Sequence, residues 1–373
     1  MNVILLFRQE VFVKGVLRNL GASGARVHVV TNVRAPAVRL SRFCHRYELI
    51  DLPGEPVYSF HFIEWMNRYT RAHGIELVVP ADVESARLLS VNRFAMLSCE
   101  SYPISRKDVL LTLDNKCRFA AFLDRHRIAT PRTVVVESMA DLDGAAMGEM
   151  TFPVIVKPPQ GSGGAGAERQ ETPADLRAYL TSGAPLAALP VVVQEFIEGE
   201  TVGINILAKD GEIVASTIMR EPDPETLVFI SDERIEALGR RVAAAARYTG
   251  FANIDLRVRA GDGEPFIIEC NPRFGFRTWV SMLYGVNFVD IGMRVATGRP
   301  LPGAAPRRHG RYVHHRQCLK ALLRPWRRAA AVSAESRRGL RLVLSDPLPL
   351  IHGLARRALS RLAARLGMAR TEG

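Results

Sequence analysis

The sequence predicts an α/β protein in three parts: a small N-terminal parallel α/β domain, a central α+β domain, and a basic, partly helical C-terminal extension. Near the N-terminus, apolar strand-like runs alternate with helix-compatible runs, as in a parallel sheet covered by helices. In the middle, short apolar strands end in charged or glycine-rich segments. Residues 1–300 carry 34 Lys and Arg against 35 Asp and Glu, whereas residues 301–373 carry 16 against 3. The change in charge places a domain boundary near residue 300.

The N-terminal domain is predicted from alternating elements. Strands are expected at residues 3–7, 26–30 and 77–80, and helices at 60–73 and 85–97. The first apolar run is too short for a signal-peptide core, and no run reaches the roughly 20 residues that a membrane-spanning helix needs. The five cysteines are scattered and odd in number, so neither a disulfide framework nor a zinc site is expected. These features favour a cytoplasmic protein.

In the central domain, a predicted hairpin collects the most informative side chains. Residues 252–258 and 266–273 form two strand-like runs around a glycine-containing turn. Because side chains alternate along a strand, Glu269, Asn271 and Arg273 point to one side, and Asp255 of the first strand can face Glu269. Two carboxylates and an amide oxygen suit Mg²⁺, and an adjacent arginine suits a transferring phosphoryl group. The alternative is a surface hairpin with a charged face.

Upstream, a second segment favours a nucleotide over that alternative. The short strand at residues 152–157 ends in Lys157 and leads into a glycine-rich run at 161–166, whose backbone N–H groups can close over an anion. This is not the phosphate-loop spacing, but a lysine fixed before the run favours a nucleotide lid over a linker. A third strand at residues 191–195 leads into an acidic hinge that suits an adenine edge and a ribose, although acidic hairpin turns are also common without a ligand.

On these motifs the chain resembles the ATP-grasp superfamily of carboxylate-amine and carboxylate-thiol ligases. The likeness runs from about residue 113 to 297, and no single motif carries it. It implies a two-lobed ATP-grasp domain at 113–300, with a lid subdomain at about 130–195, between an N-terminal domain at 1–112 and a C-terminal extension at 301–373. Five motifs follow one another in the expected order: Asp114-Asn115-Lys116, Ile155-Val156-Lys157-Pro158 with its glycine loop, the segment 194–199, Asn253-Ile254-Asp255, and the segment 269–273.

The resemblance implies a role for each matching residue. Lys116 and Lys157 would contact the ATP phosphates, and Arg273 would steady the acyl-phosphate transition state. Arg220, expected just after a strand, is a weaker candidate for the phosphate or the substrate carboxylate, with a solvated strand end as the alternative. The covering loop would include Gly161, Ser162, Gly163 and Gly164, and the adenine would meet Glu195, Phe196 and Ile197.

The metal and ribose sites follow from the same resemblance. Asp255, Glu269 and Asn271 would bind Mg²⁺, with two ions expected, Glu269 bridging them, and Mn²⁺ as a possible substitute. Many relatives carry the ribose-binding carboxylate two positions after the hinge glycine, where this chain has Thr201. Glu200, one position after that glycine, is the candidate here.

The reaction implied is the joining of a carboxylate to an amine through an acyl phosphate, with release of ADP and Pi. The first alternative is a bicarbonate-activating enzyme of the same fold. The second is a non-enzymatic ATP-binding protein that associates with a membrane or a partner through its basic tail. Small-molecule substrates and a homodimer are the expected partners.

In the tail, leucines at near-helical spacing alternate with arginines between residues 350 and 366. Such a helix suits an anionic membrane surface or an acidic partner. The interpretation we favour is a helix that packs its leucines on the protein body and exposes its arginines. Aromatic residues do not interleave with the arginines, so specific nucleic-acid binding is not expected. We therefore expect a cytoplasmic protein, peripheral at the membrane if the tail binds lipid.

Overall fold

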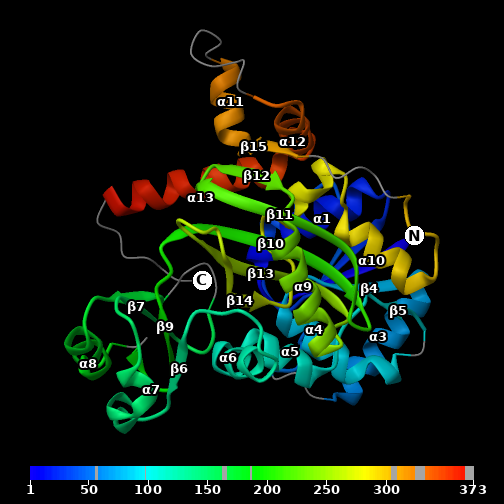
Figure 1. The fold of residues 1–373 in the computed structure, drawn as a ribbon. Coiled ribbons are helices and arrows are strands. Elements are labelled where there is room, and N and C mark those ends of the chain that lie inside the picture. The colour runs from blue at the N-terminus through cyan, green and yellow to red at the C-terminus, as the bar shows by residue number, and fades with distance from the viewer. Residues whose placement is uncertain are drawn as a thin grey trace. The chain divides into compact units, whose positions relative to one another are not determined.

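The structure, a computed structural model, describes residues 1–54, 58–96, 98–161, 166–184, 187–303, 309–323 and 332–365. Its contacts divide the chain into two compact units. Unit 1 comprises Met1–Tyr102, Phe276–Pro306 and Arg311–Gly373, and unit 2 comprises Pro103–Gly275 and Arg307–Gly310. The elements of each unit carry their labels in Figure 1.

Unit 1 is built on a five-stranded parallel sheet in the order β3-β2-β1-β4-β5. The three predicted strands are confirmed as its central ones, and their side chains are almost all buried. The two edge strands were not predicted, because one is polar and the other contains only two residues. The bounds are β1 Asn2–Phe7, β2 Arg26–Thr31, β3 Cys44–Leu49, β4 Leu77–Pro80 and β5 Glu100–Ser101.

The helices of unit 1 begin and end at recognisable capping residues. Helix α3 (Phe60–His73) has the predicted bounds: Ser59 caps its first turn, and Gly74 ends it in the left-handed conformation. Helix α4 (Val83–Asn92) begins two residues before its predicted start and ends five before its predicted end. The other helices of the unit's first hundred residues and of its 276–303 segment are α1 Glu10–Ala22, α2 Pro36–Arg39, η1 Arg93–Ala95, η4 Thr278–Tyr284 and α10 Phe288–Thr297.

The C-terminal part of unit 1 is largely helical. It contains the short strand β15 (Gly310–Val313) and the helices α11 (His315–Leu323), α12 (Ala334–Leu344) and α13 (Pro347–Arg365). Helix α13 contacts both α2 and α12. Within the described part of the chain, no helix combines the length and the apolar character required to cross a membrane.

Unit 2 contains a central antiparallel sheet with the order β14-β13-β10-β11-β12. Helix α9 (Glu233–Ala246) packs on β10, β11 and β14 through its apolar face, which includes the buried Ile235, Leu238 and Val242. Two further helices, α5 (Lys107–Asp114) and α6 (Lys116–Arg125), contact β14. The strand bounds are β10 Gly199–Lys209, β11 Glu212–Asp223, β12 Thr226–Ile230, β13 Gly250–Arg259 and β14 Pro265–Asn271.

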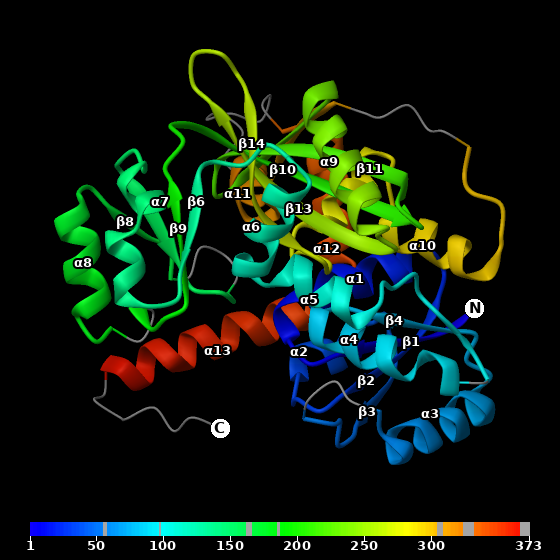
Figure 2. The same cartoon turned by 60° about the horizontal axis from the view of Figure 1, so that its bottom comes forward.

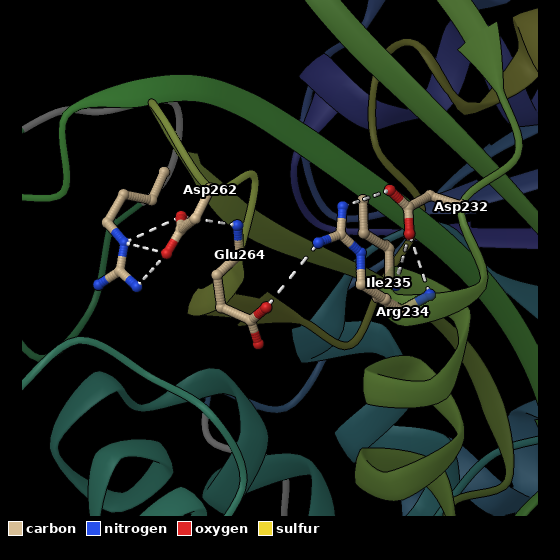
Figure 3. A network of polar contacts seen from close by, with 6 residues as sticks. Asp232, Arg234, Ile235, Asp262 and Glu264 are labelled. Atoms are coloured by element: carbon tan, nitrogen blue, oxygen red, sulfur yellow. Dashed lines mark hydrogen bonds and ion pairs between the residues drawn. The ribbon is translucent and has the colours of Figure 1, made fainter.

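Polar contacts connect the turn between β13 and β14 to the start of α9 (Figure 3). Asp262 in the turn accepts hydrogen bonds from the Arg259 guanidinium at 3.1 Å and from the Glu264 N–H at 3.1 Å. Arg234 approaches Glu264 at 3.9 Å and Asp232 at 3.6 Å. Asp232 in turn caps α9. The turn of the hairpin is therefore held against the helix that covers the sheet.

The second sheet of unit 2 has the order β6-β9-β7-β8 and is antiparallel throughout (Figure 2). Alternate residues of its strands, including Val154, Val156, Val191 and Val193, form one apolar core with residues at and around α7 (Ala145–Gly148) and α8 (Pro173–Thr181). The opposite face of the same strands is mixed: it carries the polar Thr133, Lys157 and Gln194 together with Val135, Ile155 and Val192. The strand bounds are β6 Thr133–Val136, β7 Val154–Lys157, β8 Glu168–Gln170 and β9 Val191–Glu195.

The limits of the two units differ from the expected domain boundaries near residues 112 and 300. Residues 276–303 belong to unit 1 because α10 packs on α1, and the Tyr102 hydroxyl donates a hydrogen bond to the Phe288 carbonyl at 2.8 Å. The domains at 1–112, 113–300 and 301–373 remain predictions about which segments build the nucleotide-binding part.

Candidate active site

The hairpin of β13 and β14 brings the predicted metal ligands together. Asp255 is directly opposite Glu269, and Asn253 is opposite Asn271, so these side chains lie on one face of the sheet. The Asn271 amide donates a hydrogen bond to Asp255 Oδ2 at 3.2 Å. Arg273 Nη2 donates to Asn271 Oδ1 at 2.8 Å. The predicted hairpin and the predicted facing of Asp255 and Glu269 are therefore present.

Negative charge is concentrated at this face. The pKa of Asp255 is raised to about 7, first because the carboxyl group is removed from water and then because Glu269 and Glu221 lie near it. Arg273 and Lys157 act in the opposite direction. A divalent cation would relieve the repulsion between the two carboxylates, and two carboxylates with one amide fit Mg²⁺, which completes its shell with water and phosphate oxygens. Among the described residues there is no group of three or more His, Cys, Asp or Glu side chains arranged for a metal.

Lys116 connects the metal-ligand strand to the glycine-rich loop. It is the first residue of α6, whose N-terminus is capped by the Asn115 side chain. Its Nζ lies 3.2 Å from Glu269 Oε1 and donates a hydrogen bond to the Gly161 carbonyl at 3.1 Å. The Lys116 ammonium group is thereby held between a carboxylate and the start of the loop, where it would contact phosphate oxygens of a nucleotide.

Lys157 ends β7 on the face of the second sheet that lies opposite its apolar core. Its side chain is only 8% exposed, and its Nζ donates a hydrogen bond to Gln194 Oε1 at 2.8 Å. Burial lowers the pKa of Lys157 to about 8, and the carboxylates of Glu269 and Asp255 act in the opposite direction. The ammonium group is therefore desolvated and lacks a directly bonded anion among the described residues. A phosphate group would supply that anion.

Gln194 is a residue whose part in the site the sequence did not reveal. It lies on β9, is 5% exposed, and donates through Nε2 to Thr133 Oγ1 of β6 at 3.0 Å while accepting from Lys157. Three strands thus share one chain of hydrogen bonds that fixes the lysine ammonium. The signal was available in the alternation of Val191 to Val193, which directs Gln194 to the face of β9 opposite the core.

The predicted adenine segment is held by the protein's own backbone. The N–H groups of Glu195 and Phe196 donate to the carbonyls of Arg132 and Pro153, at 2.9 and 3.0 Å. The Glu195 carboxylate accepts from the Thr151 N–H at 2.7 Å. These contacts fix the hinge, whereas the contact of Glu195, Phe196 and Ile197 with adenine stays a prediction.

Two arginines lie against the hinge. The guanidinium groups of Arg169 and Arg257 lie 4.5 and 5.3 Å from the centre of the Phe196 ring. Arg257 also donates to the Ile197 carbonyl at 2.9 Å and to the Thr201 hydroxyl at 3.0 Å. Thr201, which stands where many relatives carry a carboxylate, is therefore already bonded within the protein.

Glu200 and Arg220 bind each other. Arg220 Nη1 donates to Glu200 Oε2 at 3.0 Å, and both side chains are well exposed. Arg220 lies inside β11, not after a strand, so its expected place at a strand end was wrong. The pairing brings together the residues predicted for the ribose and for an anionic group of the substrate. Ser162, Gly163 and Gly164 lie outside the described residues, and Gly161 at the edge of the loop has a φ of 147°.

Two family profiles match the segment that carries this geometry. One, described as an ATP-grasp domain, matches residues 113–222, and the other, described as ATP-grasp in the biosynthetic pathway with Ter operon, matches residues 188–318. Together they include every residue of the candidate site. The chain belongs to the ATP-grasp superfamily. The second match also continues into the segment expected to form the C-terminal extension.

Individual relatives and structures agree with this membership. The carbamoyl phosphate synthase large chain of Thermotoga neapolitana is 27% identical over 244 residues, which are 59% of this chain and 22% of that protein. An L-amino acid ligase from Bacillus licheniformis superposes with a TM-score of 0.58 at 16% identity, covering 79% of this chain and 73% of that one.

A third ATP-grasp comparison comes from a solved complex. The biotin carboxylase domain of Hydrogenobacter thermophilus 2-oxoglutarate carboxylase, in complex with MgADP, ADP and bicarbonate, superposes with a TM-score of 0.58 at 17% identity, over 80% of this chain and 70% of that one. At such identities the structures show the shared fold. The matched segments make up only about a tenth to a fifth of the first curated relatives' length, for example 11% of the Neurospora crassa multifunctional protein pyr-3.

Proposed function

We propose that this ATP-grasp protein is a ligase that activates a carboxylate as an acyl phosphate and joins it to an amine, releasing ADP and Pi. The single observation that supports this most is the placement of Asp255 opposite Glu269, with Lys116 bonded to Glu269 and Arg273 bonded to Asn271. One face of the hairpin thus offers ligands for a cation, a lysine for phosphate and an arginine for the reacting group.

ATP would bind by its phosphates to the two lysines. Lys116 and Lys157 would neutralise the phosphate chain, and the loop beginning at Gly161, with Ser162, Gly163 and Gly164, would cover it. Asp255, Glu269 and Asn271 would hold Mg²⁺, which withdraws charge from the phosphate oxygens. A pair of ions bridged by Glu269, and replacement by Mn²⁺, are finer proposals of the same kind. Glu195, Phe196, Ile197 and Glu200 would contact the nucleoside.

In the first step, a carboxylate oxygen of the substrate attacks the γ-phosphorus as the bond to the β,γ-bridging oxygen breaks. The products are the acyl phosphate and ADP. Charge spreads over the transferring oxygens, so Arg273 and Lys157 would stabilise the transition state by position and charge, without a protein nucleophile. Arg220 is proposed for the substrate carboxylate only if its bond to Glu200 opens.

In the second step, the amine nitrogen attacks the acyl carbon, the bond from that carbon to the phosphate oxygen breaks, and the amine loses a proton. The products are an amide and Pi. The desolvated environment of Lys157 and Gln194 would protect the acyl phosphate from water. Gln194 would act as a positioning residue, because its bonds to Lys157 and Thr133 hold the ammonium group in place.

One observation favours a second candidate within the same chemistry. The curated relatives include carbamoyl phosphate synthase large chains, which makes bicarbonate a carboxylate to be tested beside organic acids. A small-molecule substrate pair, a homodimer, a cytoplasmic location and peripheral membrane binding through residues 301–373 are likewise proposals.

Hydroxylamine trapping tests the proposed function. The purified protein is incubated with Mg-ATP, hydroxylamine and either bicarbonate or pools of amino acids and other carboxylates, and hydroxamate and Pi are measured. An organic carboxylate should give hydroxamate and Pi in equal amounts, and Glu269→Gln should abolish both. Glu264→Gln, in the exposed turn of the same hairpin, is the matched control and should leave both unchanged. Pi formed with bicarbonate alone would favour the second candidate, and no product from any donor would contradict both.

A further inference from the structure

Helix α13 exposes an apolar strip instead of burying it. Leu348, Ile351, Leu354 and Leu359 are 52%, 56%, 53% and 64% exposed. Their spacing of three to five residues places them along one side of the helix, with Ala355 between them. The expectation that the leucines pack on the protein body is therefore wrong for Leu354 and Leu359. Leu350 is half-buried, and the side chains of Leu362 and Leu366 lie outside the described part of the chain.

The start of α13 is the part of the helix that is anchored. Asp346, directly before the helix, accepts hydrogen bonds from the Ser41 hydroxyl at 2.6 Å and the Arg42 N–H at 2.8 Å. Pro349 is buried in the first turn, and α13 contacts α2. Figure 2 shows the helix continuing beyond α2, where it leaves the other elements of unit 1. The strip stays exposed because the attachment uses the start of the helix, and the described side chains from Leu354 to Ser360 are exposed.

Arginines are exposed on α13 and on the helix that precedes it. Residues 347–365 contain no Asp or Glu, and Arg356 is exposed on α13. Arg337, Arg338 and Arg341 are exposed on the preceding helix α12. None of these four arginines forms an ion pair with another described residue. The surface thus combines uncovered apolar side chains with uncompensated cations.

We propose that α13, with the arginines of α12, docks this protein on an anionic lipid membrane, with the helix lying in the plane of the interface. The strip would enter the boundary between headgroups and acyl chains, and the guanidinium groups would meet lipid phosphates. A helix of 19 residues offers about 28 Å of such contact. A second copy of the chain would place the same arginines against each other. Charge complementarity therefore favours the lipid surface.

Vesicle sedimentation of the full chain tests the proposal. Vesicles of phosphatidylcholine with phosphatidylglycerol should bind the protein, pure phosphatidylcholine vesicles should bind it weakly, and added salt should weaken binding to the anionic vesicles. Ile351→Glu should lower the partition coefficient by about tenfold or more, and Arg356→Ala by about fivefold. Val11→Glu is the matched control, because Val11 lies on helix α1 of the same unit, is 61% exposed, and should change nothing.

Three results would overturn the proposal: no binding to anionic vesicles, equal binding by the Ile351→Glu variant, or equal binding to neutral and anionic vesicles. A concentration-dependent dimer that Ile351→Glu dissociates, without any vesicle binding, would assign the strip to a second copy and also overturn it. Mg-ATP binding should be unchanged in the variant, so this test is independent of the proposed ligase function. Circular dichroism should show unchanged helix content, because the substituted side chains are exposed.

Discussion

Replacing Lys157 with methionine should stabilise the nucleotide-free protein while removing its response to ATP. Methionine keeps the length of the side chain and removes the charge that the site buries. Burial lowers the pKa of Lys157 from 10.5 to about 8, so at neutral pH the ammonium group costs the folded state about 3 kcal/mol relative to the unfolded state. The substitution also leaves Gln194 Oε1 without its donor, which costs about 1 to 2 kcal/mol. The net expectation is a gain of about 1 to 2 kcal/mol at pH 7.

The pH dependence follows from the same values. Below pH 8 Lys157 is protonated in both the folded and the unfolded state, so the buried charge destabilises the folded wild type by its full amount. Between pH 8 and 10.5 the unfolded state binds more proton than the folded state, so the wild type becomes relatively more stable as the pH rises. Above pH 10.5 both states are neutral, and the advantage of the variant should have disappeared.

Urea unfolding across this pH range, with and without Mg-ATP, measures both effects. Mg-ATP should raise the free energy of unfolding of the wild type, because it binds the folded state. It should not stabilise the Lys157→Met variant. Lys209→Met, at an exposed position of unit 2, is the matched control and should keep both the wild-type pH dependence and the ATP response. A Lys157→Met protein that is less stable than the wild type at pH 7, or that keeps the full ATP response, would refute the reasoning.

Three further substitutions probe other parts of the account. Glu269→Gln should abolish the Mg²⁺-dependent part of ATP binding measured by calorimetry, because half of the carboxylate pair is lost, whereas Glu264→Gln should not. Burial lowers the pKa of His28 to about 4, so the wild type should lose about 2 kcal/mol between pH 8 and pH 5, where the unfolded state binds the proton, and His28→Gln should lose less. In thermal melts, Gly292→Ala should destabilise by about 2 to 3 kcal/mol, because a Cβ would lie 2.1 Å from a buried tyrosine ring, whereas Gly148→Ala has open space.

Each of these three predictions has a result that would contradict it. Unchanged Mg²⁺-dependent binding in Glu269→Gln would remove the hairpin from the metal site. A pH profile of unfolding that is the same in the wild type and the His28 variant would contradict neutral burial of the imidazole, which faces His45, His73, Tyr69, Arg26 and Arg46. A Gly292→Ala protein as stable as the wild type would show that the tyrosine ring can move.

The sequence was sufficient for those parts of the site that depend on local alternation. Glu269 and Asn271 are two residues apart on one strand, and the short turn after Arg259 sets the register that places Asp255 opposite Glu269. Lys157 could be recognised because it ends a strand that only three residues separate from a glycine-rich run. In each case a few neighbouring residues determine the geometry.

Contacts between distant segments could not be predicted in this way. The bond from Gln194 to Thr133 joins residues 61 positions apart, and the Glu200 to Arg220 pair depends on the register of two long strands. The leucines of α13 illustrate a different limit. Their spacing indicated an amphipathic helix, but it could not show that α13 is anchored at its start, through Asp346, and leaves Leu354 and Leu359 exposed.

The most direct measurement of the central claim follows one oxygen atom. A carboxylate identified by hydroxylamine trapping is labelled with a heavy oxygen isotope in its carboxyl group and incubated with Mg-ATP, its amine partner and the wild-type protein. The account predicts that one labelled oxygen appears in the released Pi, because the acyl-phosphate bond contains a carboxylate oxygen. Amide formation with unlabelled Pi would contradict the account.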